Sequence, residues 1–289
     1  MTVVPPPAAT APSRLIVTGA RGQVGREILR LAPGAHAFGH RELDITDPIA
    51  VRAVLEPGDT VLNCAAYTAV DQAESDPEAA FACNETGPAV LAAACARAGA
   101  RLIHLSTDYV FPGTHDHPYD TTDPTGPATV YGRSKLAGEQ AVLSLTTQAH
   151  VVRTAWVYAA TGSDFVTTML RLERERDTIE VVDDQLGSPT YAADLAAALL
   201  ELVGRPDAPR LLHATNAGQA SWFELARAVF AGAGADPARV HPCDSTAFPR
   251  PARRPAYSVL SNQSWVVSGL TPLRDWRVAL GDALSNRSG

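Results

Sequence analysis

A glycine-rich turn near the start of the chain constrains the fold more than any other feature. The apolar run 15–17 is followed by Gly19, Gly22 and Gly25 before a helical pattern over 23–31. In a nucleotide-binding βαβ unit, such glycines permit a tight turn, let the backbone approach a pyrophosphate and let the helix pack on the strand. The positive end of the helix favours the phosphates. The turn therefore predicts a dinucleotide site, and a tight turn without ligand is the alternative.

Strand and helix patterns alternate through the first half of the chain. Apolar runs predict strands at 36–38, 60–63, 101–105 and 151–153. Helical patterns lie beside them at 23–31, 48–55, 78–83, 89–98 and 131–143. This alternation predicts an α/β fold, namely a Rossmann-like doubly wound parallel sheet covered on both faces, with a smaller C-terminal substrate-binding domain.

The second half is less regular. Helical patterns occur at 165–175, 192–203, 221–231 and 276–284, a strand at 211–214, and a Pro- and Arg-rich stretch at 237–255 that we expect to be irregular. We expect an NAD(P)-binding domain over 14–155, to which 192–214 returns as one more layer. The substrate-binding part would consist mainly of 156–191 and 215–289. The Pro/Ala-rich start, 1–13, predicts a disordered tail and has no signal-peptide pattern.

Composition narrows the possible functions. The net charge is −7 with acids and bases interspersed, so no nucleic-acid partner is expected. The sequence has no run of about 18 apolar residues, which argues against a membrane span. The four cysteines lack C-x-x-C spacing and predict reduced side chains in a cytoplasmic protein without zinc. We expect a monomer or a homodimer.

Lys135 is the only lysine, and the other 23 basic residues are arginines. It follows Tyr131 by four positions, which places both side chains on one face of a helix, one turn apart. A nearby ammonium favours the phenolate and lowers the pKa of a tyrosine, which can then exchange a proton with a carbonyl oxygen. The same ammonium can bind a ribose. The alternative is an ordinary surface lysine.

Hydroxyl groups follow the strand predicted at 101–105. Ser106 and Thr107 stand where ligands bind in open α/β sheets, at the carboxyl end of a strand, and either could polarise a substrate carbonyl. Serine and threonine often end strands, so this signal is weak without the turn and the Tyr131–Lys135 pair.

The cofactor type is less well defined. The turn has G-x-x-G-x-x-G spacing, and the acidic residue expected after the second strand is missing. Arg41 near that position, or Arg21 in the turn, could hold a 2′-phosphate, which favours NADPH, with NADH as the alternative. Asp44 and Ile45 could meet the adenine ring or form a turn before the next helix.

At this point the chain resembles the extended short-chain dehydrogenases/reductases, and more closely the dTDP-4-dehydrorhamnose reductase family. The resemblance extends over nearly the whole chain after residue 13. The matching stretches are GARGQVG at 19–25, LDITDP at 43–48, NCAAYTAVDQAE at 63–74, STDYVFPG at 106–113, VYGRSKLAGE at 130–139, RTAWVY at 153–158, DQLGSPT at 184–190 and RRPAYSVL at 253–260.

The resemblance implies roles for these residues. Tyr131 would donate the proton, with Lys135 as its partner on the nicotinamide ribose and Thr107 as the third catalytic residue. Thr107 and Asp108 would face the sugar, together with Trp156, whose alternative is a core position. Arg253, with its neighbour Arg254, would pair with the diphosphate or stay solvated. The implied cofactor-binding residues are Gly19, Gly22, Gln23, Val24, Gly25, Asp44, Ile45, Ala65, Ala66, Tyr67, Tyr131 and Lys135.

The implied reaction is hydride transfer from NAD(P)H to C4 of a dTDP-4-keto-6-deoxy-L-hexose, giving dTDP-L-rhamnose. One alternative is a sister reductase of an antibiotic pathway, such as a dTDP-dihydrostreptose synthase, with the same catalytic residues. Another is a non-catalytic nucleotide-binding regulatory subunit, against which the complete catalytic set argues. Some family members dimerise through magnesium. Glu27 matches one such position but has no convincing partners, so no metal is predicted.

Overall fold

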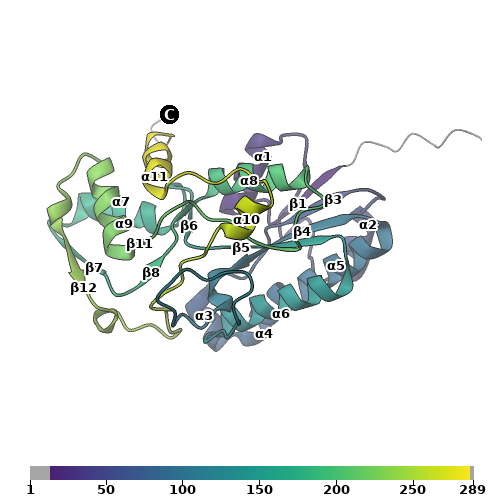
Figure 1. Ribbon diagram of the computed structural model, residues 1–289, viewed down its shortest axis with the longest axis horizontal. Helices are drawn as coiled ribbons and strands as arrows, with labels where there is room; N and C mark the ends of the chain where they lie inside the picture. The colour runs from purple at the N-terminus through teal and green to yellow at the C-terminus, as the bar shows by residue number, and fades with distance from the viewer. Residues whose placement is uncertain (1–13, 287–289) are drawn as a thin grey trace, which may run out of the picture.

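The computed structural model describes residues 14–286, and the disordered tail expected at 1–13 lies outside this range. A six-stranded sheet in the order β10-β5-β4-β3-β1-β2 forms the centre (Figure 1), and all its pairs are parallel. The predicted doubly wound parallel sheet is confirmed. The order reverses between β1 and β3, the kind of place where open α/β sheets bind ligands. The strands are β1 (Leu15–Thr18), β2 (His36–Phe38), β3 (Thr60–Asn63), β4 (Arg101–Thr107), β5 (Ala149–Thr154) and β10 (Leu211–His213).

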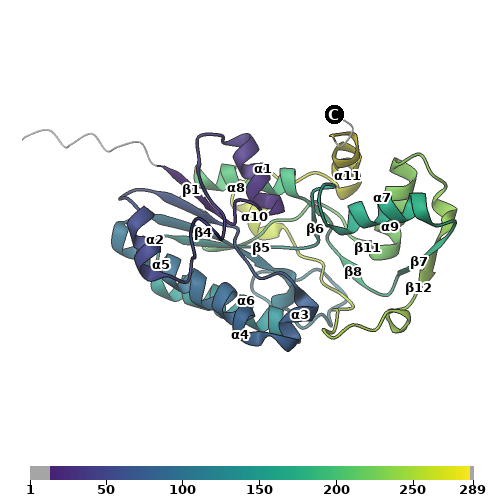
Figure 2. The same ribbon diagram turned by 180° about the vertical axis from the view of Figure 1, so that it is seen from behind.

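Helices cover both faces of this sheet (Figures 1 and 2). One face carries α1 (Gln23–Leu31), α8 (Ala192–Val203) and the short α10 (Gln263–Val267). The other carries α2 (Pro48–Val54), α5 (Gly87–Ala98) and α6 (Val130–Leu145). Because apolar helix faces pack on both sides, β3 is buried along all four residues.

A continuous helical stretch precedes β4. α4 (Pro77–Phe81) runs through the π-helical turn η1 (Ala82–Thr86) directly into α5. The sequence pattern predicted two separate helices here, at 78–83 and 89–98, and did not predict α3 (Val70–Ser75). The π turn adds a residue to one helical turn and so redirects the side chains around it, a feature that is frequent at functional sites.

The C-terminal part has its own apolar core and packs beside the sheet (Figure 1). It contains α7 (Phe165–Glu175), α9 (Trp222–Gly232), α11 (Trp276–Ser285), and the strand pairs β6 (Val157–Tyr158) with β9 (Thr190–Tyr191), β7 (Ile179–Val182) with β12 (Val240–Cys243), and β8 (Leu186–Gly187) with β11 (Ala220–Ser221). Short 3₁₀ turns are η2 (Asp108–Val110), η3 (Pro237–Arg239) and η4 (Ser245–Ala247).

The expectation that 237–255 is irregular is wrong for its first part. β12 lies within this stretch and pairs in parallel with β7, so a strand forms despite Pro242 at its third position. Pro242 is tolerated because β12 lies at the edge of a two-stranded sheet. The remainder, up to residue 255, has only the short turn η4.

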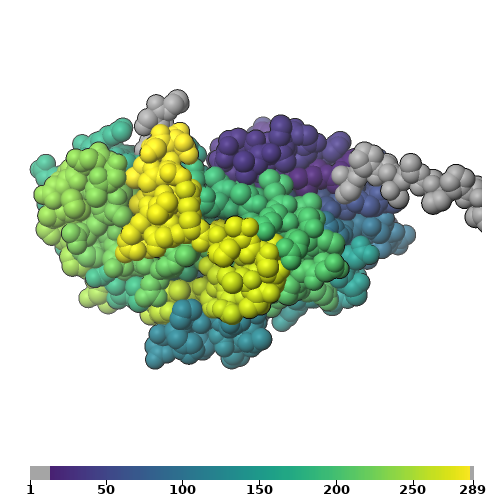
Figure 3. Space-filling model, turned by 45° about the horizontal axis from the view of Figure 1, so that its top comes forward, coloured from purple at the N-terminus to yellow at the C-terminus, as the bar shows by residue number. Residues whose placement is uncertain are grey.

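The C-terminal segment connects the two parts of the molecule. α10 contacts β10 of the large sheet, whereas α11 contacts β9 and α9 of the smaller part. Figure 3 shows this segment, in yellow, on the surface along both parts. None of the helices in the described range is long and apolar enough to cross a membrane.

Candidate active site

A cavity of about 640 Å³ opens at the carboxyl ends of the central strands. Its lining comes from the glycine-rich turn, from the ends of β3, β4 and β5, from α6 and from the first residue of α9. The lining residues are Gly22–Arg26, Cys64, Ala66, Thr68, Val70, Leu105–Tyr109, Tyr131, Lys135, Thr154–Val157, Ser163 and Trp222. The structure therefore brings together the predicted turn, the strand-end hydroxyl groups and the tyrosine–lysine pair.

Two glycines of the turn are required by close backbone approach. Gly19 has φ +67°, and a Cβ there would lie 2.5 Å from the backbone nitrogen of Ala65. At Gly25 a Cβ would lie 2.5 Å from the carbonyl oxygen of Gly19, so this glycine lets α1 pack on the turn. Gly22 meets only that same oxygen at 3.2 Å and lines the cavity. The turn thus leaves bare backbone facing the cavity at the start of a helix.

Helix α6 is held close to the site by its cap and by its own glycines. The Thr129 hydroxyl accepts a hydrogen bond from the Gly132 N–H at 3.0 Å. A Cβ at Gly132 would lie 2.3 Å from the carbonyl oxygen of Tyr109, and one at Gly138 would lie 2.0 Å from that of Asn84. Without these glycines the helix would be pushed away from η2 and η1, and Tyr131 would move with it.

Tyr131 is a buried phenol beside Thr107. Its ring packs edge-on against Tyr109, with 5.5 Å between centroids. Burial raises the pKa of Tyr131 to about 12, and a hydrogen bond with the Thr107 hydroxyl opposes this rise. The expectation that Lys135 lowers this pKa is wrong for the protein without ligand, because burial outweighs every opposing contact. The phenol is therefore protonated at neutral pH and can act as a proton donor.

Asp108 shares this corner of the cavity. The Thr107 hydroxyl donates to its carboxylate at 2.9 Å. Burial raises the pKa of Asp108 to about 6, although hydrogen bonds to its carboxylate oppose the shift. Among the described residues, Ser106 Oγ and Thr154 Oγ1 have no hydrogen-bond partner. Both residues line the cavity, which is therefore equipped for a polar ligand.

Lys135 is also buried, with only 2% of its surface exposed. Its ammonium donates to the Leu105 carbonyl oxygen at 2.6 Å and lies 3.4 Å from His104 Nε2. Burial lowers the pKa of Lys135 to about 8, and the nearby Glu139 opposes that shift. The alternative of an ordinary surface lysine is excluded by this position.

Asn84, in the π turn η1, was missed by sequence reasoning. Its side-chain oxygen accepts from the Tyr67 N–H at 2.9 Å, and its side-chain nitrogen donates to the Tyr67 carbonyl at 3.0 Å. The same nitrogen donates to the Ser134 hydroxyl at 3.0 Å. Asn84 thereby ties the loop after β3 to α6 next to Lys135. Its sequence context is that of an ordinary helix, so no local pattern indicates this role.

Trp156 forms part of the cavity wall in a strained conformation. Its φ of +45° is rare for a bulky residue and is maintained by its surroundings. Its ring stacks on that of Trp222, with 3.5 Å between centroids and 5° between planes. A Cβ at Gly187 would lie 2.2 Å from the Trp156 ring, so only glycine leaves room for it. Trp222 was not predicted as a site residue.

Several predicted residues lie outside this cavity. Asp44 is exposed and accepts hydrogen bonds from Thr46, which lower its pKa. Ile45 is buried against Gly87, where a Cβ would lie 2.5 Å from its side chain. Arg21, a candidate for a 2′-phosphate, forms an ion pair with Glu42. Neither the adenine nor the 2′-phosphate assignment gains support from these contacts.

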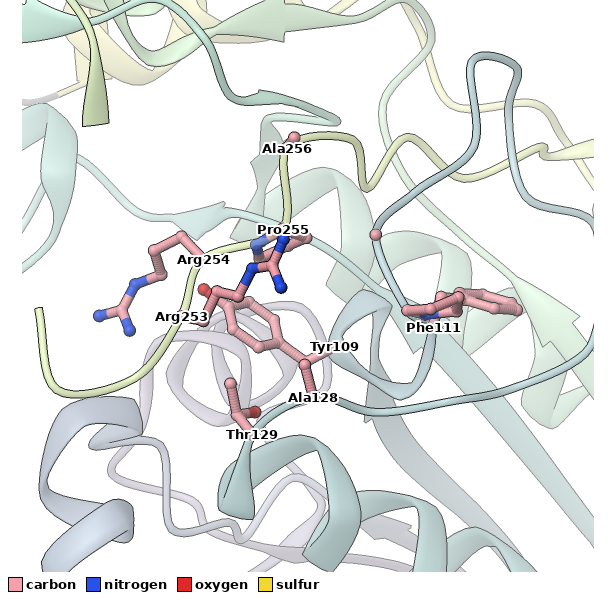
Figure 4. A pocket seen from close by; sticks show the side chains of 10 residues that line it. Tyr109, Phe111, Ala128, Thr129, Arg253, Arg254, Pro255 and Ala256 are labelled. Atoms are coloured by element: carbon pink, nitrogen blue, oxygen red, sulfur yellow. The ribbon is translucent and has the colours of Figure 1, made fainter. Parts of the chain in front are cut away.

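Arg253 borders a separate small hollow beside Tyr109, Ala128 and Thr129 (Figure 4). It is exposed, whereas its neighbour Arg254 donates two hydrogen bonds to Asp71, at 2.9 and 2.8 Å. Figure 4 shows both arginines on one loop that passes beside the Tyr109 ring.

Comparisons with known proteins agree with this geometry. A sequence model of the family described as "RmlD substrate binding domain" matches residues 13–288. The chain is 56% identical over 281 residues to a dTDP-4-dehydrorhamnose reductase from Mycolicibacterium smegmatis, covering 94% of this chain and 85% of the relative.

The chain belongs to the dTDP-4-dehydrorhamnose reductase family.

Two further members broaden the comparison. A Streptomyces antibioticus relative described as a probable dTDP-4,6-dihydroxy-2-methyloxan-3-one 4-ketoreductase is 50% identical, covering 93% of this chain and 94% of its own length. A crystal structure of dTDP-4-dehydrorhamnose reductase from Bacillus anthracis in complex with NADP superposes with a TM-score of 0.90 at 36% identity, covering 95% and 99% of the two chains.

The residues of this family member fit a dinucleotide cofactor. Gly22 leaves backbone uncovered at the N-terminus of α1, where a pyrophosphate is favoured. Lys135 can offer its amine to a ribose, and the unpartnered hydroxyl groups of Ser106 and Thr154 line the same cavity.

Proposed function

We propose that this protein catalyses the NAD(P)H-dependent reduction of the C4 keto group of dTDP-4-dehydro-L-rhamnose to dTDP-L-rhamnose. The observation that carries the proposal is the meeting of the Tyr131 phenol and the Thr107 hydroxyl in the cavity, beside the glycine-rich turn. The relative with 56% identity, which is named for this reaction, supports it.

Tyr131 and Thr107 act on the keto oxygen. The bound NAD(P)H supplies the hydride that reaches C4. The Thr107 hydroxyl hydrogen-bonds to the oxygen and polarises the carbonyl, and the Tyr131 phenol gives its proton to that oxygen as its charge develops. Because the pKa of Tyr131 is about 12, its proton is present over the whole neutral range. Lys135 holds the ribose and offsets the phenolate charge that remains.

Other residues bind the two ligands. The turn at Gly22 and Gln23 holds the pyrophosphate, and Ala66 lets the backbone pass close to the cofactor. Trp156 and Asp108 line the part of the cavity wall against which the pyranose lies. Arg253, which is exposed and borders the small hollow beside Tyr109, takes the diphosphate. NADPH is the proposed cofactor, which the NADP complex of the Bacillus anthracis relative supports.

Cofactor binding and substrate binding are assigned to two different parts of the chain. Residues 14–155 together with 192–214 form the cofactor-binding domain, because β10 extends the large sheet and α8 packs on α1. Of the described residues, 156–191 and 215–286 form mainly the substrate-binding part. Since the cavity is lined by Trp156 and Trp222 on one side and by the turn on the other, both parts contribute to one site.

A sister reductase acting on another dTDP-4-keto sugar is the second candidate. It is favoured by the Streptomyces antibioticus relative, which is named for a different 4-keto substrate at 50% identity. The catalytic residues would be unchanged, and the difference would lie in the contacts of the sugar.

The proposal is tested with purified protein, both nicotinamide cofactors and synthetic dTDP-4-dehydro-L-rhamnose. Tyr131→Phe should lower kcat by roughly 10²- to 10⁴-fold, the usual contribution of a positioned proton donor, while the Kd for NADPH stays unchanged. Tyr158→Phe is the matched control, because Tyr158 is buried in the C-terminal core and does not line the cavity. Full activity of Tyr131→Phe contradicts the proton-donor role, and equal turnover of several dTDP-4-keto sugars contradicts the rhamnose assignment.

A further inference from the structure

A row of buried polar side chains crosses the sheet beneath the cavity. Thr18, Asn63 and His104 are direct register partners on the adjacent strands β1, β3 and β4. The Thr18 hydroxyl lies 2.7 Å from Asn63 Oδ1, Asn63 Nδ2 lies 2.9 Å from His104 Nδ1, and His104 Nε2 lies 3.4 Å from Lys135 Nζ. None of the four residues is more than 2% exposed. Such a row is costly in a sheet interior unless its members satisfy one another.

The hydrogen bonds of Asn63 fix the orientation of its amide. Its oxygen accepts from the Thr18 hydroxyl and from the Ala65 N–H at 3.1 Å, so this side of the amide must be the acceptor. The amide nitrogen therefore faces His104 and donates to Nδ1. Nδ1 then carries no hydrogen.

The state of the His104 ring follows from this contact. Burial lowers the pKa of His104 well below its usual value, so the ring is neutral. A neutral imidazole with a bare Nδ1 has its hydrogen on Nε2. That N–H is directed at the nitrogen of Lys135, 3.4 Å away.

An N–H that points at an ammonium destabilises its positive charge. An uncharged amine, by contrast, can accept a hydrogen bond from that N–H. Lys135 is surrounded by groups on several elements: Glu139 on its own helix, Cys64 after β3, Cys83 in η1 and His104 on β4. Glu139 favours the ammonium but is itself bound by Arg153, at 2.9 and 2.7 Å. Burial lowers the pKa of Lys135 to about 8, in the same direction as the His104 N–H.

We propose that Asn63 and His104 are positioning residues that set the protonation of Lys135: Asn63 locks His104 with its hydrogen on Nε2, and this N–H favours an uncharged amine in the free protein. The uncharged amine accepts a hydrogen bond from His104, whereas the protonated amine donates to a ligand. A ligand that accepts from Lys135 therefore favours uptake of a proton. Only the catalytic consequence of this arrangement rests on the proposed function.

The first test uses the unmodified protein, because Lys135 is the only lysine and gives a single side-chain signal after ¹⁵N-lysine labelling. Its titration midpoint should lie well below the ordinary value of about 10.4. The ¹⁵N shifts of His104, assigned by comparison with His104→Gln, should show a neutral ring with hydrogen on Nε2 throughout the neutral range. A ring with hydrogen on Nδ1, an imidazolium, or an ordinary lysine midpoint overturns the proposal.

The second test reverses the His104 tautomer. In Asn63→Asp the carboxylate still accepts from Thr18 and Ala65 but presents an oxygen to Nδ1, which must then carry the hydrogen. Nε2 becomes an acceptor for the ammonium, and the Lys135 midpoint should rise by about one pH unit or more. Because the new charge alone also raises this midpoint, the change is repeated in a His104→Phe background, where most of the rise should disappear. A rise of the same size there contradicts a path through His104.

The pH dependence of kcat/KM is an independent test of the proposal. If Lys135 acts as proposed, the basic limb of the kcat/KM pH profile moves to higher pH in Asn63→Asp, in step with the lysine midpoint. A shifted midpoint without any reductase activity in the unmodified protein would leave the Asn63–His104 arrangement in place and refute the proposed reaction. If Asn63→Asp fails to fold, the tautomer and midpoint of the unmodified protein still decide the question.

Discussion

The buried carboxyl group of Asp108, beside Thr107, lowers the stability of the folded protein at neutral pH. Burial raises the pKa of this carboxyl group to about 6 from an unperturbed value of 3.8. The folded state therefore holds a proton that the unfolded state has released between about pH 4 and pH 6. The resulting stabilisation is complete below pH 4 and is lost as the pH rises through 6. Two pKa units correspond to about 3 kcal/mol.

This sign leads to a prediction for Asp108→Asn. Asparagine cannot ionise, so the variant should gain free energy of unfolding relative to the natural protein as the pH rises from 4 to 7, by up to about 3 kcal/mol. Its activity should fall, because Asp108 lines the cavity. Urea unfolding at a series of pH values measures the difference, and Asp207→Asn, at an exposed position, is the control. A difference that does not change with pH contradicts the raised pKa.

At the residue scale, the sequence was informative where chemistry is tied to spacing. The single lysine four positions after Tyr131, and the hydroxyl groups after the 101–105 strand, all line the cavity. Asn63 was recognised only as part of a matching stretch, and His104 only as a strand residue. Their partners lie 41 and 31 positions away along the chain, so no local pattern indicates them.

Helix α6 is fastened to the sheet by a buried ion pair. Arg153 on β5 binds Glu139 through two hydrogen bonds, at 2.9 and 2.7 Å, and their side chains are only 4% and 2% exposed. Removing one partner leaves the other charge buried without compensation. Glu139 lies one helical turn after Lys135 on α6. The pair therefore holds this part of the helix against β5 and contributes to the position of the catalytic residues.

We therefore predict that Glu139→Gln lowers the free energy of unfolding by about 3–5 kcal/mol. The matched control is Glu175→Gln on α7, whose ion pair with Arg171 is 50% and 58% exposed and should contribute less than about 1 kcal/mol. Chemical denaturation of both variants at neutral pH checks the prediction. Equal losses in the two variants would contradict a special role for the buried pair.

At the element scale, local capping signals predicted the starts of two helices correctly. The Asp47 cap before Pro48 and the Ser221 capping box with Glu224 start α2 and α9 as predicted. α3, the π turn and β12 were missed. Two of them depend on a partner elsewhere: β12 pairs with β7, and the π turn is tied to α6 through Asn84.

At the scale of the whole molecule, Asp71 links the cofactor-binding part to the C-terminal part. It lies on α3 beside the cofactor half and binds Arg254, 183 positions later, through both carboxylate oxygens. The backbone N–H of Ala252 donates to the same carboxylate at 3.2 Å. These contacts lower the pKa of Asp71 against the effect of burial.

Arg253 and Arg254 are neighbours with different proposed roles. Arg254 links the two parts through Asp71, and Arg253 binds the diphosphate. Arg254→Ala should lower Tm by about 2 °C or more, because a charge-assisted pair of about 1 kcal/mol is lost. Arg253→Ala should leave Tm unchanged, since Arg253 is exposed and forms no ion pair within residues 14–286. It should instead raise KM for the dTDP-sugar while leaving the Kd for NADPH unchanged. Thermal unfolding and steady-state kinetics of both variants test this, and a lower Tm in Arg253→Ala alone would contradict it.

The sequence by itself determined the parallel α/β architecture, the glycine-rich turn and the Tyr131–Lys135 pair. These depend on periodicity, caps and short spacings, which act within one or two turns of the chain. Tertiary structure alone decided the row from Thr18 to Lys135, because it requires β3 to lie between β1 and β4 with a defined register. It also decided the Trp156–Trp222 stack and the bridge from Asp71 to Arg254. Such contacts join residues far apart in the chain, and only packing of the whole core brings them within hydrogen-bonding distance.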